Sequence, residues 1–148
     1  LLEEILDVIN CKVPILIEIK DHKKIGKLET KLVCILNNYD GDYLIQSFNP
    51  YIVYWFKKKF PFILRGQLSY SYKNKKIGFF RRIMLSNMLF NKISKPHFIS
   101  YKYDELPIEK IRKFQKCGVT VLGWTINNRN DLVKFLDIYD NLIVDNLI

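Results

Sequence analysis

The chain of 148 residues carries 24 lysines and arginines against 15 aspartates and glutamates, which gives a formal net charge of +9. Hydrophobic residues make up 49% and charged residues 26%, a balance that indicates one globular domain and excludes a disordered chain. No apolar run approaches the roughly 20 residues of a membrane-spanning helix. The charge alone is compatible with nucleic acid, anionic lipid or a phosphorylated substrate, and an AT-rich genome would produce the same bias.

Apolar periodicity predicts helices and strands in regular alternation. Helices are expected over 1–9, 25–36, 51–59, 77–92, 107–116 and 131–139, and strands over 15–20, 43–48, 62–68, 98–103, 119–126 and 142–145. Leu1 already lies inside the first helical pattern, so we expect that the native start is missing. Alternation of this kind predicts an α/β fold with a parallel sheet, either open or closed as a barrel.

The three cysteines, Cys11, Cys34 and Cys117, lie far apart and in no CxxC or Cys/His ligand spacing. Neither a disulfide framework nor a zinc site is therefore predicted. Reduced thiols in a cytoplasmic protein are the expectation, and a missing N-terminal region could add membrane association.

The strand over 15–20 places the carboxylate of Glu18 and the ammonium of Lys20 on one face, because side chains alternate along a strand. Burying an unpaired charge is costly, so these two groups need each other, a metal or a charged ligand. A structural ion pair at the strand end and a functional site both remain open at this point.

Polar residues gather where the predicted strands end, and in parallel α/β folds these carboxyl ends form the active-site face. The residues concerned are Glu18, Lys20, 46–49, Gly66, Gln67, 124–127, Asp145 and Asn146. The sequence therefore predicts one functional rim along the ends of the strands.

In order and spacing, these strand ends resemble the C-terminal part of the glycerophosphodiester phosphodiesterase family. The matching pieces are Ile17-Glu18-Ile19-Lys20, Gln46-Ser47-Phe48-Asn49-Pro50, Arg65-Gly66-Gln67-Leu68, Gly123-Trp124-Thr125-Ile126-Asn127 and Ile143-Val144-Asp145-Asn146. The resemblance implies the C-terminal part of a TIM-type (β/α)8 barrel, with about five to six βα units and without its N-terminal strands. Residues 1–148 would then be a single, N-terminally truncated domain of an enzyme of lipid metabolism.

The resemblance also implies roles for individual residues. Glu18 would be one ligand of a divalent cation, Mg²⁺ or Ca²⁺, and Lys20 would lie beside the substrate phosphate. Trp124 would line the pocket for the glycerol end, although large aromatic residues on strands are commonly core residues. Gln46 and Asn127 are further candidates for substrate binding, and Asn127 could instead cap the following helix.

The family's catalytic histidines and its other metal carboxylates precede the Glu-Ile-Lys strand, and their motifs are missing from this sequence. These motifs are a His-Arg-Gly start, a Pro-Glu-Asn-Thr segment, a Glu-x-Asp strand and a His-Asp pair. Neither His22 nor His97 matches a catalytic position. His22 is expected in a surface loop and His97 at the opposite end of a strand, so no catalytic residue is assigned in this chain.

The leading hypothesis is that the complete enzyme hydrolyses glycerophosphodiesters to glycerol 3-phosphate and an alcohol, while this chain alone is inactive. The substrate would be a small molecule, with no role for nucleic acid. One alternative is a non-catalytic remnant that binds phosphodiesters or regulates a partner. Another is a basic membrane-surface protein, because the helix over 77–92 is amphipathic and basic. The edges of an incomplete barrel would favour self-association.

Overall fold

The computed structural model describes residues 1–147, in which strands and helices alternate along the chain. The strands are β1 (Ile15–Glu18), β2 (Tyr43–Ser47), β3 (Arg65–Ser69), β4 (Phe98–Lys102), β5 (Thr120–Ile126) and β6 (Asn141–Val144). The helices are α1 (Leu2–Ile9), α2 (Lys27–Leu36), α3 (Pro50–Lys59), α4 (Phe79–Ser86), α5 (Asn91–Ser94), α6 (Ile108–Lys116) and α7 (Arg129–Phe135).

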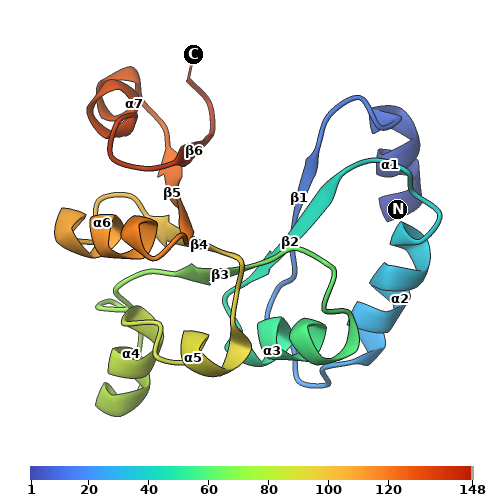
Figure 1. Cartoon of the computed structure of the whole chain (residues 1–148), viewed down its shortest axis with the longest axis horizontal. Coiled ribbons are helices and arrows are strands. Elements are labelled where there is room, and N and C mark those ends of the chain that lie inside the picture. The colour runs from blue at the N-terminus through green and yellow to red at the C-terminus, as the bar shows by residue number, and fades with distance from the viewer. Residues whose placement is uncertain (148) are drawn as a thin grey trace.

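The six strands form one parallel sheet in the order β1-β2-β3-β4-β5-β6, so each strand pairs with the next one in the sequence. The sheet curls with its helices on the outside and opens between β1 and β6 (Figure 1). The fold is a partial TIM-type barrel, which confirms the predicted fold class.

The convex face of the sheet carries the apolar core. Ile45 on β2 packs with α2 and α3, whereas Ile99 and Val121 on β4 and β5 pack with Ile111 of α6. Because side chains alternate along each strand, the intervening residues face the inside of the curl. One register row there runs through Glu18, Gln46, Gly66 and Phe98.

The strand predicted over 62–68 begins only at Arg65, so its first three residues were placed wrongly. Phe62 is 96% exposed in the turn that precedes β3. The buried guanidinium of Arg65 donates hydrogen bonds to the carbonyls of Pro61 and Ile63, and also to that of Lys95. These bonds hold residues 61–63 in a turn and prevent them from extending the strand.

The single helix predicted over 77–92 is also wrong, because the chain forms α4 and α5 with a break between them. Met88 has a left-handed backbone with a φ of 53°, and its side chain is buried in the core around α6. The Asn87 side chain donates to the carbonyl of Ile83 and closes the end of α4. Burial of Met88 therefore turns the chain at the point where the periodicity alone would continue the helix.

Cys11, Cys34 and Cys117 are all free and exposed. Among the helices of residues 1–147, none combines the length and the apolar character that are needed to cross a bilayer.

Candidate functional site

Glu18 and Lys20 form an ion pair at the end of β1, with 2.7 Å between Lys20 Nζ and Glu18 Oε1. The Lys20 side chain is 82% exposed, whereas that of Glu18 is 28% exposed and lies at the edge of the concave face. An exposed pair of this kind contributes at most about 1 kcal/mol to stability. Lys20 can therefore exchange this partner for an anionic ligand at little cost in stability.

The neighbouring strand ends are held by buried side chains of the convex face. The Ser47 hydroxyl donates to the carbonyl of Ile19 at 2.7 Å and accepts a hydrogen bond from the backbone N–H of Asn49. The Gln67 amide donates to the carbonyls of Ser47 and Phe48. Together these bonds fix the chain just beside Lys20 and just before α3.

Gln46 lies on the concave face and is only 6% exposed. Its Oε1 accepts a 2.8 Å hydrogen bond from the hydroxyl of the buried Ser100 on β4. The sequence singled out Gln46, but it gave no signal for Ser100, because a lone serine on an apolar strand carries no motif. The structure places the Gln46 side chain in a buried polar contact within the curl.

Trp124 lies in an aromatic cluster that we call the rim aromatics, made of Phe48, Tyr70 and Trp124. The ring of Trp124 packs edge to face with those of Phe48 and Tyr70, at centroid distances of 5.5 and 6.3 Å. Burial raises the pKa of Tyr70. The indole N–H of Trp124 is buried and has no hydrogen-bond partner among the described residues. An acceptor oxygen on a ligand would satisfy that donor.

Asn127 is exposed and does not cap the next helix. The cap of α7 is Asn128, whose side chain accepts a hydrogen bond from the backbone N–H of Asp131. Tyr103 reaches the same helix through a 2.7 Å hydrogen bond to the carboxylate of Asp131. The capping alternative for Asn127 was therefore wrong by one residue, and its side chain is left at the rim.

Lys102, the last residue of β4, places a second cationic group at the rim, and it was missed from the sequence. Lys102 Nζ lies 2.8 Å from a carboxylate oxygen of Glu105 and 3.2 Å from one of Asp104. The hydrogen bond that Lys102 donates to the Glu105 carboxylate raises the pKa of Lys102. Glu105 also accepts from the backbone N–H of Ser71 and thereby joins the loops that follow β3 and β4. Asp104 and Glu105 lie in the loop after β4, and acidic residues close to a lysine resemble ordinary surface, so their spacing did not single out Lys102.

His22 is not the free surface residue that the sequence suggested. Its Nε2 lies 3.1 Å from the carboxylate of Glu29, which is fully buried at the start of α2, and its Nδ1 lies 3.0 Å from the carbonyl of Lys20. The contact with that carbonyl, together with the Glu29 carboxylate, raises the pKa of His22. His97 directly precedes β4, where its Nδ1 accepts from the backbone N–H of Arg65, as expected for the opposite end of the sheet.

A groove of about 780 Å³ lies beside the rim, between the loop after β2 and the segment that leads into α4. Two rim aromatics, Phe48 and Tyr70, form part of its wall, and Arg81 and Met84 come from α4. Asp21 also lines the groove, where its carboxylate accepts a 2.7 Å hydrogen bond from Asn49. The groove therefore extends the strand-end site with a largely apolar and aromatic surface.

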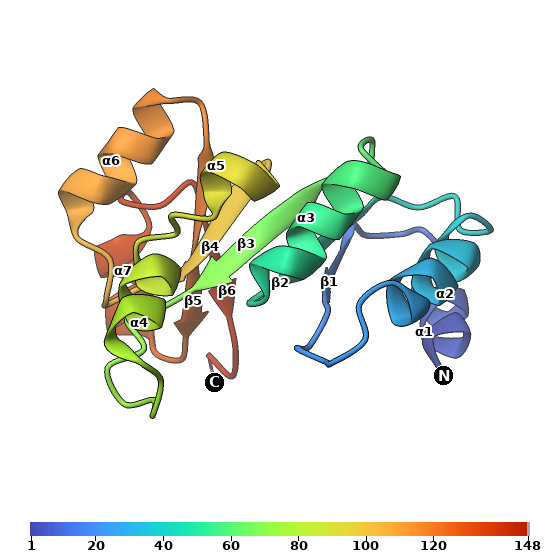
Figure 2. The ribbon, with the colours of Figure 1, turned by 90° about the horizontal axis from the view of Figure 1, so that it is seen from below.

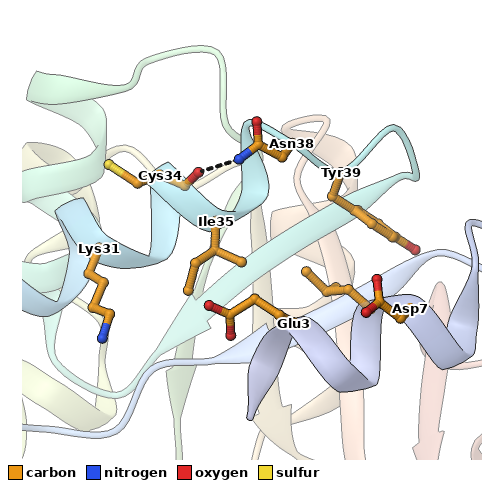
Figure 3. A pocket seen from close by; sticks show the side chains of 8 residues that line it. Glu3, Asp7, Lys31, Cys34, Ile35, Asn38 and Tyr39 are labelled. Atoms are coloured by element: carbon orange, nitrogen blue, oxygen red, sulfur yellow. Dashed lines mark hydrogen bonds between the residues drawn. The ribbon is translucent and has the colours of Figure 1, made fainter.

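A smaller cavity of about 360 Å³ lies between α1 and α2, on the convex side of the sheet. Figure 3 shows Glu3 and Asp7 from α1 opposite Lys31, Cys34 and Ile35 from α2. The rim side chains are not part of its lining. This cavity is therefore separate from the candidate site.

A divalent cation needs several oxygen ligands: Ca²⁺ takes six or more, and Mg²⁺ requires near-octahedral ligation. Within residues 1–147, no group of three or more His, Cys, Asp or Glu side chains could hold a metal ion. Glu18 already contacts Lys20. The described residues alone therefore do not fit a cation site.

Models of known protein families give no match to this chain, and neither do curated protein sequences. Solved structures do match. A glycerophosphodiester phosphodiesterase from Parabacteroides distasonis has a TM-score of 0.74 at 16% identity and covers 97% of this chain and 59% of its own. The chain has a partial glycerophosphodiester phosphodiesterase fold.

Two further structures agree with this assignment of the fold. The glycerophosphodiester phosphodiesterase of Thermotoga maritima has a TM-score of 0.61 at 19% identity, with 87% of this chain and 53% of its own covered. An Oleispira antarctica phosphodiesterase, in complex with the product sn-glycerol-3-phosphate, has a TM-score of 0.60 at 18% identity, with 78% and 44% covered. The chain thus spans about half the length of the solved structures that it matches.

Proposed function

We propose that this chain forms the substrate-facing wall of a phosphoric diester hydrolase that cleaves glycerophosphodiesters to glycerol 3-phosphate and an alcohol. The observation that carries the proposal is the position of Lys20 and Trp124 at the carboxyl ends of a half-barrel whose fold matches such enzymes. One matching phosphodiesterase was solved with sn-glycerol-3-phosphate. The activity is proposed for the whole enzyme, and this chain alone is expected to be inactive.

The chain's own residues would bind and orient the substrate. The exposed ammonium of Lys20 would turn from Glu18 toward a phosphate oxygen, because a phosphodiester anion favours a nearby point charge. The rim aromatics would offer an apolar wall to the glycerol carbons, and the unpaired indole N–H of Trp124 would donate to a hydroxyl oxygen. Asn127, exposed at the same rim, would add a further polar contact.

Groups outside this chain would complete the chemistry. A divalent cation, Mg²⁺ or Ca²⁺, would take Glu18 as one oxygen ligand and would need its other ligands from elsewhere. General acid and base groups would also come from elsewhere, because His22 is engaged with Glu29 and His97 lies at the far end of the sheet.

Calorimetric titration of the chain with glycerol 3-phosphate tests the binding half of the proposal. We expect Lys20→Met to weaken binding by at least about tenfold, since charge-assisted hydrogen bonds are worth about 1.5–3 kcal/mol. Lys24→Met, a change to an exposed lysine of the same loop, is the matched control and should leave binding intact. Glu18→Gln frees Lys20 and should bind the anion at least as tightly as the native chain. Equal affinities for Lys20→Met and the native chain would exclude this site.

A second candidate function is phosphodiester binding without turnover. The observation that favours it is that the Glu18 carboxylate is already paired with Lys20 at 2.7 Å. Choline release from glycerophosphocholine with Mg²⁺ or Ca²⁺ separates the two candidates when it is measured on a form extended to the length of the solved barrels. Turnover that is lost in Glu18→Gln supports the enzyme, whereas binding without turnover supports the second candidate.

A further inference from the structure

Two adjacent phenylalanines at the start of α4 lie open to solvent. Phe79 is 62% exposed and Phe80 is 81% exposed, and Met84, one turn further along, is 38% exposed. Within α4 itself no residue is buried. Scattered exposed apolar residues are common on protein surfaces, but a cluster of large ones beside one another marks a surface that binds something.

The charge around these rings has one sign. Every charged residue between Asp42 and Asp104 is a lysine or an arginine. The Arg82 guanidinium lies 5.5 Å from the centre of the Phe79 ring. The carboxylates of Asp21 and Glu105 in the surrounding loops are already bonded to Asn49 and Lys102. The cations nearest the phenylalanines in the sequence are Lys73, Lys75, Lys76, Arg81 and Arg82.

Closing the barrel would not cover this surface. The open edges of the sheet are β1 and β6, whereas α4 follows β3 in the middle of the sheet. The end of α4 is anchored there, because the Ser69 hydroxyl donates to the carbonyl of Leu85 and the Tyr101 hydroxyl donates to that of Ser86. Figure 2 shows the loop before α4 reaching past the ends of the strands, on the same side as the rim.

We propose that residues 73–84, the docking segment, bind an anionic lipid surface. Phe79 and Phe80 would enter the boundary between headgroups and acyl chains, and the surrounding lysines and arginines would meet the lipid phosphates. Aromatic rings backed by cations are the pattern of interfacial helices, in which burial and electrostatic attraction act together. Because the groove also contains Arg81 and Met84, a docked chain holds the groove and the rim against the lipid surface.

Co-sedimentation with vesicles tests the proposal without any need for catalysis. The native chain should sediment with phosphatidylcholine vesicles that contain phosphatidylglycerol, and should stay in solution with phosphatidylcholine alone. Neutralising Arg81 and Arg82 as Arg81→Gln and Arg82→Gln should lower the partition coefficient by about fivefold for each cation removed. Added salt should weaken binding, since the Debye length shrinks to about 3 Å at 1 M.

Phe62 is a matched control for the contribution of Phe79 and Phe80 to vesicle binding. Phe62 is 96% exposed but precedes β3, at the other end of that strand from the docking segment. The double variant Phe79→Ser, Phe80→Ser should lose vesicle binding by at least about tenfold, whereas Phe62→Ser should bind like the native chain. The proposal would be overturned if Phe62→Ser lost as much vesicle binding as the double variant, or if the double variant bound as well as the native chain. It would also be overturned if the native chain did not sediment with vesicles that contain phosphatidylglycerol.

Brominated lipids give an independent readout of insertion. The indole introduced by Phe80→Trp should be quenched by bromines on the acyl chains, and the one introduced by Phe62→Trp should not. Each variant is compared with the native chain, which already contains Trp55 and Trp124. Sedimentation of Phe80→Trp without quenching would mean that charge alone binds the chain to vesicles. It would contradict the proposal that Phe79 and Phe80 insert into the lipid.

Discussion

The Ser100 hydroxyl on β4 donates a 2.8 Å hydrogen bond to the amide oxygen of Gln46 on β2, and β3 lies between the two strands. Both side chains are buried on the concave face. A polar contact across three strands holds the curvature of the sheet next to the candidate site.

Removing the hydroxyl should be more harmful than removing both partners. Ser100→Ala leaves the buried Gln46 oxygen without its donor, and we expect it to lower the free energy of unfolding by about 1–3 kcal/mol. Adding Gln46→Met to Ser100→Ala replaces the orphaned amide with an apolar group of similar size and should recover part of that loss. Urea unfolding of the native chain, both single variants and the double variant gives the coupling energy. Simple additivity of the two single losses would show that the hydrogen bond does not couple the strands.

Gly66 should not tolerate a methyl group. A Cβ at this position would clash with the Phe98 ring on the neighbouring strand, so the ring would have to move. We expect Gly66→Ala to lower the free energy of unfolding by about 1–3 kcal/mol, which is typical of overpacking. Gly78→Ala is the control, because a Cβ there meets no atom within 4 Å. An equal decrease in the free energy of unfolding for Gly66→Ala and Gly78→Ala would contradict the clash with Phe98.

The contact between His22 and Glu29 should make stability depend on pH. Because the pKa of His22 is raised in the folded chain, its contribution is complete below the unfolded value of about 6.5 and disappears as the pH rises through the folded value. The native chain should therefore gain stability over His22→Gln on acidification, as measured by urea unfolding at a series of pH values.

The stability contribution of His97 should depend on pH in the opposite direction to that of His22. Burial, together with the Arg65 guanidinium, lowers the pKa of His97, so protonation of this side chain opposes folding. His97→Gln should gain stability relative to the native chain as the pH falls below about 6.5. Parallel pH profiles for the native chain and His22→Gln would contradict the role given to the contact with Glu29.

The alternation of strands and helices was predictable because each strand carries apolar residues on the face that meets the helices, as at Ile45 and Ile99. Glu18, Lys20 and Trp124 could be placed at the rim because carboxyl ends of parallel strands share one edge. The family resemblance was carried by the same strand ends, and the matching solved folds agree with it.

What was missed depends on contacts between residues far apart in the sequence. The break in the helix over 77–92 follows from burial of Met88 against other elements, and the late start of β3 follows from carbonyls bonded by Arg65. Ser100 and Lys102 gain their importance only when β4 lies in the sheet. Apolar periodicity reports only on residues that are close in the sequence, so it could not predict these contacts.

Each strand pairs only with its neighbours in the sequence, and this strand order determines which part of the sheet unfolds locally first. In residues 1–147, β1 pairs only with β2, and β6 pairs only with β5, whereas β3 and β4 have partners on both sides. Local opening should therefore begin at both margins and proceed inward. Amide hydrogen exchange should be fastest in β1 and β6 and slowest around Leu68 and Ile99, so that backbone dynamics increase from the centre of the sheet toward the strand that carries Glu18.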